Sequence, residues 1–129
     1  MSKQHVFFVD DDLIAIMILK KVLEKCDLHA SSLSFKNGKE ALDYFQSNYS
    51  STDHYVIFLD INMPVMNGWE FLDALSAFTV PEKTTVFLVT SSVDEADIIR
   101  AKQYPFVSRF LSKPVSVATV NELKVMFND

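Results

Sequence analysis

Short, mostly apolar runs recur along this chain, and each is followed by a longer stretch with helical periodicity. The runs predict strands over Val6–Val9, Ala30–Leu33, Tyr55–Leu59, Thr85–Val89 and Val107–Leu111. The stretches between and after them predict helices over Asp12–Cys26, Gly38–Asn48, Gly68–Phe78, Asp94–Gln103 and Val117–Phe127. Runs this apolar are typical of parallel strands that helices cover on both faces. The pattern therefore predicts an α/β fold, a doubly wound five-stranded parallel sheet flanked by five helices.

Aspartates directly follow two of the apolar runs. Asp10, Asp11 and Asp12 come after the first run, and Asp60 comes after the third. Because parallel strands end at the same edge of a sheet, these carboxylates are expected to lie close together. At about 4 Å and an effective dielectric near 20, each pair repels by roughly 4 kcal/mol. A hard divalent cation with oxygen ligands is the usual partner of such a cluster.

Two further polar residues, Thr90 and Lys113, follow the fourth and fifth runs. In doubly wound sheets the ligand site lies at the carboxyl ends of the strands, where the strand order reverses. Each residue also has a simpler interpretation, since aspartates after a strand often cap a helix, threonine can begin a turn and lysine is usually solvated. Asp60 fits such an interpretation poorly, because a carboxylate that ends a five-residue apolar run is costly to bury.

Together these residues resemble the receiver domain of two-component response regulators, in particular stand-alone chemotaxis-type regulators. The resemblance covers residues 6 to 127 and implies a flavodoxin-like sheet in the order 2-1-3-4-5. Its motifs are Val9-Asp10-Asp11-Asp12, Leu59-Asp60-Ile61-Asn62-Met63-Pro64 with Asn67-Gly68, Val89-Thr90-Ser91-Ser92 and Phe110-Leu111-Ser112-Lys113-Pro114. The chain departs from the family at Val115, where a larger residue is common.

The resemblance implies that Asp60 accepts a phosphoryl group from a phosphohistidine. Asp11, Asp60 and the backbone carbonyl of Asn62 would bind Mg²⁺, and Asp10 would act through metal-bound water. Phosphoryl transfer relies mostly on positioning and on electrostatic stabilisation of oxygen charge.

Lys113 and Thr90 would stabilise the phosphoryl oxygens, according to the same resemblance. Phe110 matches an aromatic switch position that moves inward on phosphorylation. The resemblance also suggests a cis peptide bond between Lys113 and Pro114. The resemblance further implies that the domain is a signalling phosphoacceptor and not an enzyme, and that it catalyses only its own phosphorylation and dephosphorylation.

The first predicted helix carries apolar residues on more than one face. A stripe at helical spacing is predicted to face the core, formed by Ala15, Ile18, Leu19, Val22, Leu23 and Cys26. Ile14 and Met17 lie off this stripe, one turn from Asp11, and we expect them to form a docking patch. In the family this region meets the histidine-bearing helices of the partner. The alternative is two singly exposed apolar side chains, which are common on protein surfaces.

Composition narrows the classes of function. The 129 residues fit one domain. The resemblance implies a receiver domain over 1–129 without an effector domain, and as partners a sensor histidine kinase or histidine phosphotransfer protein and a downstream protein target. A net charge of −5 without a basic cluster argues against direct nucleic-acid binding. No apolar run reaches the length of a membrane span, and there is no secretory signal. The single cysteine, Cys26, fits a cytoplasmic location.

Two alternatives share parts of this pattern. A Mg²⁺-dependent phosphatase of the haloacid-dehalogenase type also has an aspartate nucleophile after a strand, but that class needs a second aspartate where this chain has Asn62. A flavodoxin-like module binds its cofactor phosphate with a hydroxyl-rich loop after the first strand. Three aspartates in that loop would repel the cofactor phosphate.

Overall fold

All five predicted strands are present and form one parallel sheet in the order β2-β1-β3-β4-β5, which confirms the predicted fold. The computed structural model describes residues 3–28, 31–63, 65–77, 82–91 and 94–126. The strands are β1 (Gln4–Val9), β2 (Ser31–Phe35), β3 (His54–Leu59), β4 (Thr84–Thr90) and β5 (Val107–Ser112). Most extend one or two residues past the predicted apolar run, whereas β2 lies further toward the C-terminus than predicted. Ala30, its predicted start, is outside the described residues.

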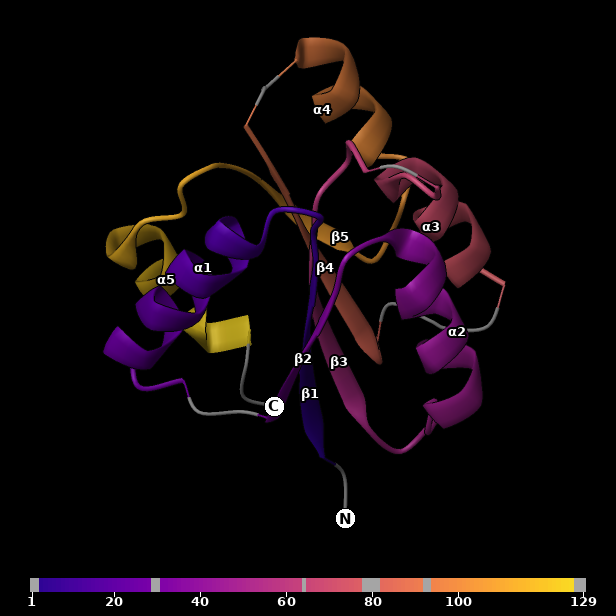
Figure 1. Cartoon of the computed structure of the whole chain (residues 1–129), viewed down its shortest axis with the longest axis horizontal. Coiled ribbons are helices and arrows are strands. Elements are labelled where there is room, and N and C mark those ends of the chain that lie inside the picture. Colours follow the sequence, from indigo (N-terminus) through magenta and orange to yellow (C-terminus); the bar gives the residue numbers. More distant parts are fainter. Residues whose placement is uncertain (1–2, 29–30, 64, 78–81, 92–93, 127–129) are drawn as a thin grey trace.

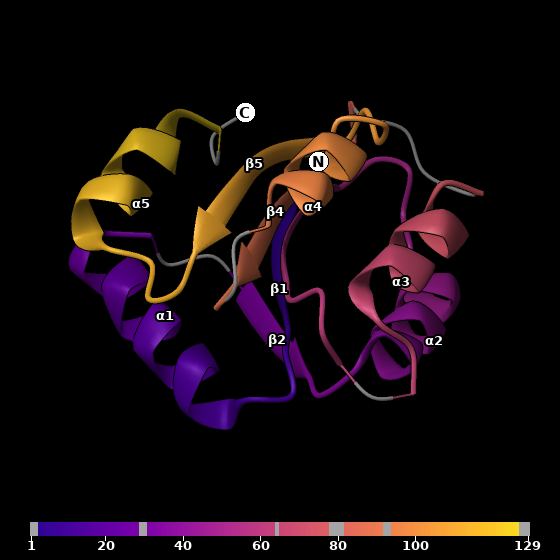
Figure 2. The ribbon, with the colours of Figure 1, turned by 90° about the horizontal axis from the view of Figure 1, so that it is seen from above.

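Helices cover both faces of the sheet, as Figures 1 and 2 show. Helix α1 (Leu13–Lys25) packs beside α5 (Val117–Leu123) on one face. Helices α2 (Gly38–Asn48) and α3 (Gly68–Leu75) lie together on the other face, where Ala101 of α4 (Glu95–Ala101) joins the same core. We call these the α1–α5 layer and the α2–α3 layer.

Residues of each strand alternate between the two layers. On β1, Phe7 and Val9 belong to the core of the α2–α3 layer, while Val6 and Phe8 belong to the core of the α1–α5 layer. All four side chains are buried. Because both faces of the strand are covered over Val6–Val9, all four of these positions are apolar, and this explains the unbroken apolar run in the sequence.

Several helices end earlier than predicted. Helix α3 ends at Leu75, and the predicted end at Phe78 is outside the described residues. Helix α4 begins after its N-cap Asp94 and ends at Ala101, where the following amides turn back to carbonyls three residues earlier. Helix α5 ends at Leu123 and continues as a 3-10 turn, η1 (Lys124–Met126). Among the described helices, none has the length and apolar character needed to cross a membrane.

The core stripe of α1 differs from the predicted stripe. Its buried residues are Ile16, Leu19 and Leu23, followed by Cys26 after the helix, so the prediction was wrong for Ile18, which is 44% exposed. Ala15 and Val22 are only half-buried. Every residue from 13 to 19 is apolar, so two stripes fit the helical period equally well. The packing of α1 against the sheet, which the sequence does not encode locally, selects one of them.

Candidate active site

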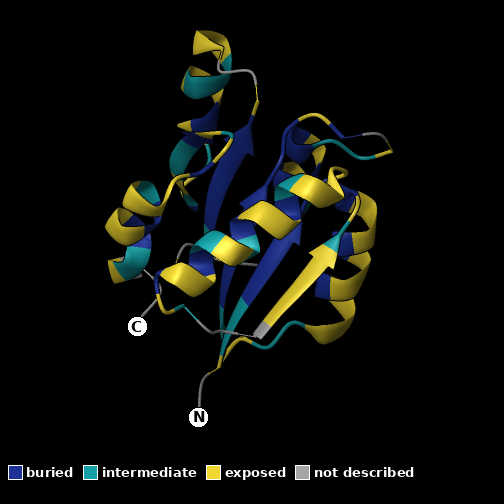
Figure 3. Cartoon of the chain, turned by 60° about the vertical axis from the view of Figure 1, so that its left-hand side comes forward, coloured by how far each residue is buried: buried dark blue, intermediate teal, exposed yellow. Residues whose placement is uncertain are grey.

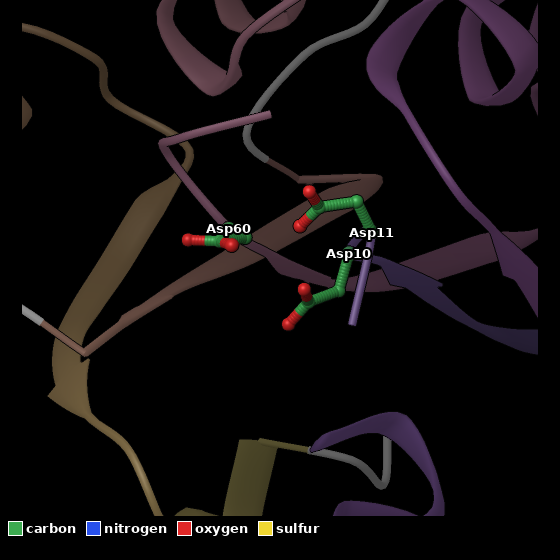
Figure 4. Close-up of side chains that lie close together, drawn as sticks. All are labelled: Asp10, Asp11 and Asp60. Atoms are coloured by element: carbon green, nitrogen blue, oxygen red, sulfur yellow. The ribbon is translucent and has the colours of Figure 1, made fainter. Parts of the chain in front are cut away.

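Asp10 and Asp60 stand at adjacent positions along one edge of the sheet. The amide of Asp60 donates to the carbonyl of Val9 at 2.9 Å, and the amide of Asp10 donates to the carbonyl of Phe35 at 3.0 Å. These bonds continue the strand ladders one residue beyond β1 and β3, and both residues are 7% exposed. The sheet therefore fixes the backbone of both aspartates, and their side chains gather with Asp11 at this edge (Figure 4).

Lys113 reaches these carboxylates from the far end of β5. Its amide donates to the carbonyl of Thr90 at 2.8 Å, which holds the residue beside the end of β4. Its Nζ lies 2.7 Å from Oδ2 of Asp10 and 3.3 Å from Oδ2 of Asp60. The Lys113–Pro114 peptide bond is cis, as the resemblance suggests. One ammonium group is thus shared by two buried carboxylates.

The charges of this group are not balanced. Burial raises the pKa of Asp60, the nearby charge of Asp10 raises it further, and Lys113 only partly opposes this shift. Burial also acts to lower the pKa of Lys113, but its hydrogen bond to Asp10 and the charge of Asp60 outweigh burial, so the net shift is upward. The ammonium therefore stays charged, while the ionised form of Asp60 is disfavoured. The site has room for further positive charge.

Asp11 completes a candidate metal centre. One carboxylate oxygen from each of Asp10, Asp11 and Asp60 lies within 4.8 Å of the others. Asp11 is exposed, whereas the other two are buried, so the cluster opens toward solvent on one side. Carboxylate oxygens suit hard divalent cations such as Mg²⁺.

Asp12 has the structural role that the sequence left open for this acidic group. Its side chain accepts hydrogen bonds from the amides of Ile14 and Ala15 and caps α1. The Asp12 amide donates to Oδ1 of Asp10 at 2.9 Å. The helix cap and the candidate metal centre therefore use different members of the same run. The capping interpretation is confirmed for Asp12, and metal binding by Asp10 and Asp11 stays a prediction.

The loop after β3 lies against Asp60. The amide of Asn62 donates to Oδ1 of Asp60 at 3.4 Å, which brings Asn62 next to the cluster, although its carbonyl remains only a predicted ligand. Gly68 begins α3 and donates to the carbonyl of Ile61 at 2.8 Å. A Cβ on Gly68 would lie 2.6 Å from the Asp60 carbonyl oxygen, so only glycine allows α3 to start this close.

The two predicted switch residues lie on adjacent strands. Thr90 ends β4 and is 1% exposed, beside Ser112 in the β4–β5 register. Phe110 pairs with Leu88 and is half-buried against the core of the α2–α3 layer. Thr90 and Phe110 thus lie near the ends of β4 and β5, on the β3 side of the sheet, whereas the acidic cluster follows β1 and β3. Their switching roles stay predictions.

The predicted docking residues are exposed on the outer face of α1. Ile14 is 68% exposed and Met17 is 59% exposed, and both lie outside the buried stripe. Leu13 and Ile18 are also exposed, so the apolar surface is larger than predicted. We call these four residues the α1 patch. In Figure 3, exposed residues are coloured yellow, and they recur along the outer sides of the helices. The extra residues could not be identified from sequence, because the rotation of α1 decides which apolar side chains face outward.

Comparison with known proteins supports one of the candidate families. Residues 6–124 match the response regulator receiver domain. A chemotaxis protein CheY homolog of Campylobacter jejuni is 30% identical over 114 residues, covering 88% of this chain and 84% of the relative. A crystal structure of a response regulator receiver protein from Dyadobacter fermentans superposes with a TM-score of 0.82 at 29% identity, covering 98% of this chain and 99% of the other.

Other relatives are much longer than this chain. It is 32% identical over 123 residues to a hybrid signal transduction histidine kinase L of Dictyostelium discoideum, covering 92% of this chain. The chain spans 7% of the length of that relative and 30% of the length of a chemotaxis protein CheV2 of Helicobacter pylori. The comparisons do not favour the phosphatase or the flavodoxin-like alternative.

Proposed function

We propose, because this chain belongs to the response regulator receiver domain family, that Asp60 accepts a phosphoryl group from a phosphohistidine. One observation carries the proposal: Asp60 is buried at the end of β3, next to Asp10 and Lys113 at one edge of the sheet. A carboxylate in this position is held by the sheet, so its oxygens are oriented before any phosphodonor arrives.

The acidic cluster suits a bound Mg²⁺. Asp10, Asp11 and Asp60 would hold the ion together with the carbonyl of Asn62, and their mutual closeness supports this assignment. The ion would supply positive charge to phosphoryl oxygens. The raised pKa of Asp60 reflects burial and the charge of Asp10, and a bound cation would favour the ionised nucleophile.

Lys113 and Thr90 would act on the phosphoryl group itself. Lys113 already faces Asp60, so its ammonium can pair with a phosphoryl oxygen once that group is attached. The Thr90 hydroxyl would donate a hydrogen bond to another oxygen. Phe110 would then shift inward as a change in population between two packed states. These groups would also support the self-catalysed dephosphorylation predicted for this domain.

We infer that the α1 patch receives the phosphohistidine-bearing partner, a sensor histidine kinase or a histidine phosphotransfer protein. Ile14 and Met17 lie within about two turns of Asp11 and are largely exposed, so a helix seated there would bring its histidine near Asp60. A separate downstream protein would bind the phosphorylated form. A cytoplasmic location also remains a prediction.

Labelling with a small phosphodonor in the presence of Mg²⁺ tests the phosphoacceptor. The parent protein should acquire an acid-stable, base-labile phosphate, and Asp60→Asn should abolish it because the nucleophilic oxygen is lost. Asp43→Asn is the matched control, since Asp43 is an exposed aspartate on α2 that pairs with Lys39. Undiminished labelling of Asp60→Asn would overturn the assignment.

Ile14→Glu tests the docking surface separately. This variant should reduce transfer from a phosphorylated histidine protein by about tenfold or more, since a buried charge in the interface costs over 1.4 kcal/mol. Labelling by a small phosphodonor should be unchanged. Val125→Glu, at an exposed position of η1, is the control and should affect neither reaction. An equal loss in both assays would mean that Ile14 supports the fold.

A further inference from the structure

A groove of about 290 Å³ lies between α1 and the loop from β5 to α5. It extends beneath the exposed surface of α1 to Phe8, Phe58, Val89 and Val115. These four side chains belong to the core of the α1–α5 layer and are at most 7% exposed. A hollow that reaches core side chains differs from a flat apolar patch, because a ligand entering it loses contact with water on several sides.

The walls of the groove come from two parts of the chain. Ile14 and Ile18 of α1 form one side, and Pro114 lies on the other. Among the described residues that line the groove, Ser91 is the one uncharged polar residue. An apolar hollow of this kind gives ordered water few hydrogen bonds, so an apolar group can displace the water at little cost. Its volume accommodates a single aromatic ring with a short chain.

The charged residues of the groove lining lie close together and set the polarity of a ligand; we call this charged part of the lining the mouth. Asp10, Asp12 and Asp60 line it together with Lys113, which gives three carboxylates against one ammonium. Lys113 is already paired with Asp10 and Asp60. An added anion would therefore meet an excess of negative charge, whereas an added cation would be attracted.

We propose that this groove binds a small hydrophobic amine, with an aromatic or branched body in the hollow and its ammonium group at the acidic mouth. Such a ligand lies under the α1 patch and next to Lys113. It competes with any protein that docks at Ile14. Because Asp10 and Asp60 are also proposed ligands of Mg²⁺, it competes with that ion as well, so the inference rests on the metal-free form of the site proposed above.

Binding of 2-phenylethylamine to the full, unphosphorylated chain in a chelator, without Mg²⁺, tests the proposal. Amide and methyl NMR shifts should change saturably at Phe8, Val89 and Val115. The carboxylate analogue 3-phenylpropionate should bind several-fold more weakly because of the charge at the mouth. Equal binding of the two compounds would overturn the proposal. The absence of a saturable shift with the amine would also overturn it, and this is the result expected if only a protein partner occupies the groove.

Val115→Phe places a ring in the hollow and should weaken binding of the amine about tenfold or more, which corresponds to 1.4 kcal/mol. Val117→Phe is the matched control, because Val117 is 39% exposed and does not line the groove. Ala15→Leu narrows the groove from the α1 side and serves if Val115→Phe fails to fold. Unchanged affinity in a folded filling variant would overturn the proposal.

Discussion

The two faces of the sheet are packed very differently. In the α2–α3 layer, aromatic rings pack between the helices and the sheet. The ring centroids of Phe45 and Tyr55 are 4.8 Å apart, and those of Phe7 and Phe45 are 5.9 Å apart. The α1–α5 layer has a groove of about 290 Å³ and leaves Ile14 and Met17 exposed. The same five strands form both faces of the sheet. One layer is therefore closed and supports the strands, while the other is open to molecules that approach the site.

Removing one buried ring from each layer should give the largest effect and tests this comparison directly. Phe71 in the α2–α3 layer and Phe8 in the α1–α5 layer are both at most 1% exposed. Replacing a buried Phe by Ala typically costs about 3–5 kcal/mol. We expect Phe71→Ala near the upper end, because it leaves a closed cavity. Phe8→Ala should lie near the lower end, because it widens a groove that is already open. Urea unfolding measures both, and equal losses would remove the distinction.

A smaller effect is expected from Asp60→Asn, which tests the cost of charge at the mouth of the open layer. The pKa of Asp60 is raised above 3.8 in the folded protein, first by burial and then by Asp10. The folded state therefore binds this proton more readily, and the parent loses stability as pH rises from 3.8 through the higher folded pKa. Without metal, Asp60→Asn should be more stable than the parent at pH 7, and this gain should disappear as pH falls below 3.8.

Thermal unfolding in a chelator across this pH range provides the measurement. Asp43→Asn corrects for the loss of one negative charge at an exposed position. A gain that persists unchanged at low pH would mean that charge at Asp60 is not its cause. Magnesium should stabilise the parent by about 2.7 kcal/mol at a hundredfold excess over Kd and should have less effect on Asp60→Asn.

The smallest effect concerns backbone strain, which also differs between the layers. Val65, in the connection to α3, has a φ of 73°, whereas Asp27, after α1, has a φ of 62°. A β-branched residue is strained in this region by about 1–2 kcal/mol, but aspartate tolerates it. Val65→Gly should stabilise the protein by up to about 1 kcal/mol after the added chain entropy is counted. Asp27→Gly should change the free energy of unfolding by only about a few tenths of a kcal/mol. A larger gain in Asp27→Gly than in Val65→Gly, measured by urea unfolding, would contradict the strain argument.

Much of this molecule could be predicted from the sequence, because the decisive patterns are local. The apolar runs identify strands covered on both faces, and the position of Asp60 after such a run identifies the edge where the site forms. Parallel strands bring their ends together, so Asp10 and Lys113 could be assigned to that edge before their contacts were known.

The features that could not be predicted depend on packing. The rotation of α1, which buries Ile16 and exposes Ile18, depends on how the helix meets the sheet. The groove that reaches Val115 depends on the space between elements distant in sequence. Val65 has a left-handed backbone conformation that valine disfavours, so its residue type gave no reason to predict that conformation. In each case the tertiary arrangement selects among local structures that the residues permit.

The amides of Asp10 and Asp60 are part of the strand ladders, so their hydrogen-exchange rates report on the sheet beneath the site. Each amide donates to the neighbouring strand, to Phe35 and to Val9 respectively. We expect their hydrogens to exchange with solvent only when these bonds to the neighbouring strand open, and such openings are infrequent in core strands. Their resonance frequencies, in contrast, respond at once to charge on the adjoining carboxylates. The exchange rates of these two amides therefore report the opening of the sheet, and their chemical shifts report charge changes at its edge.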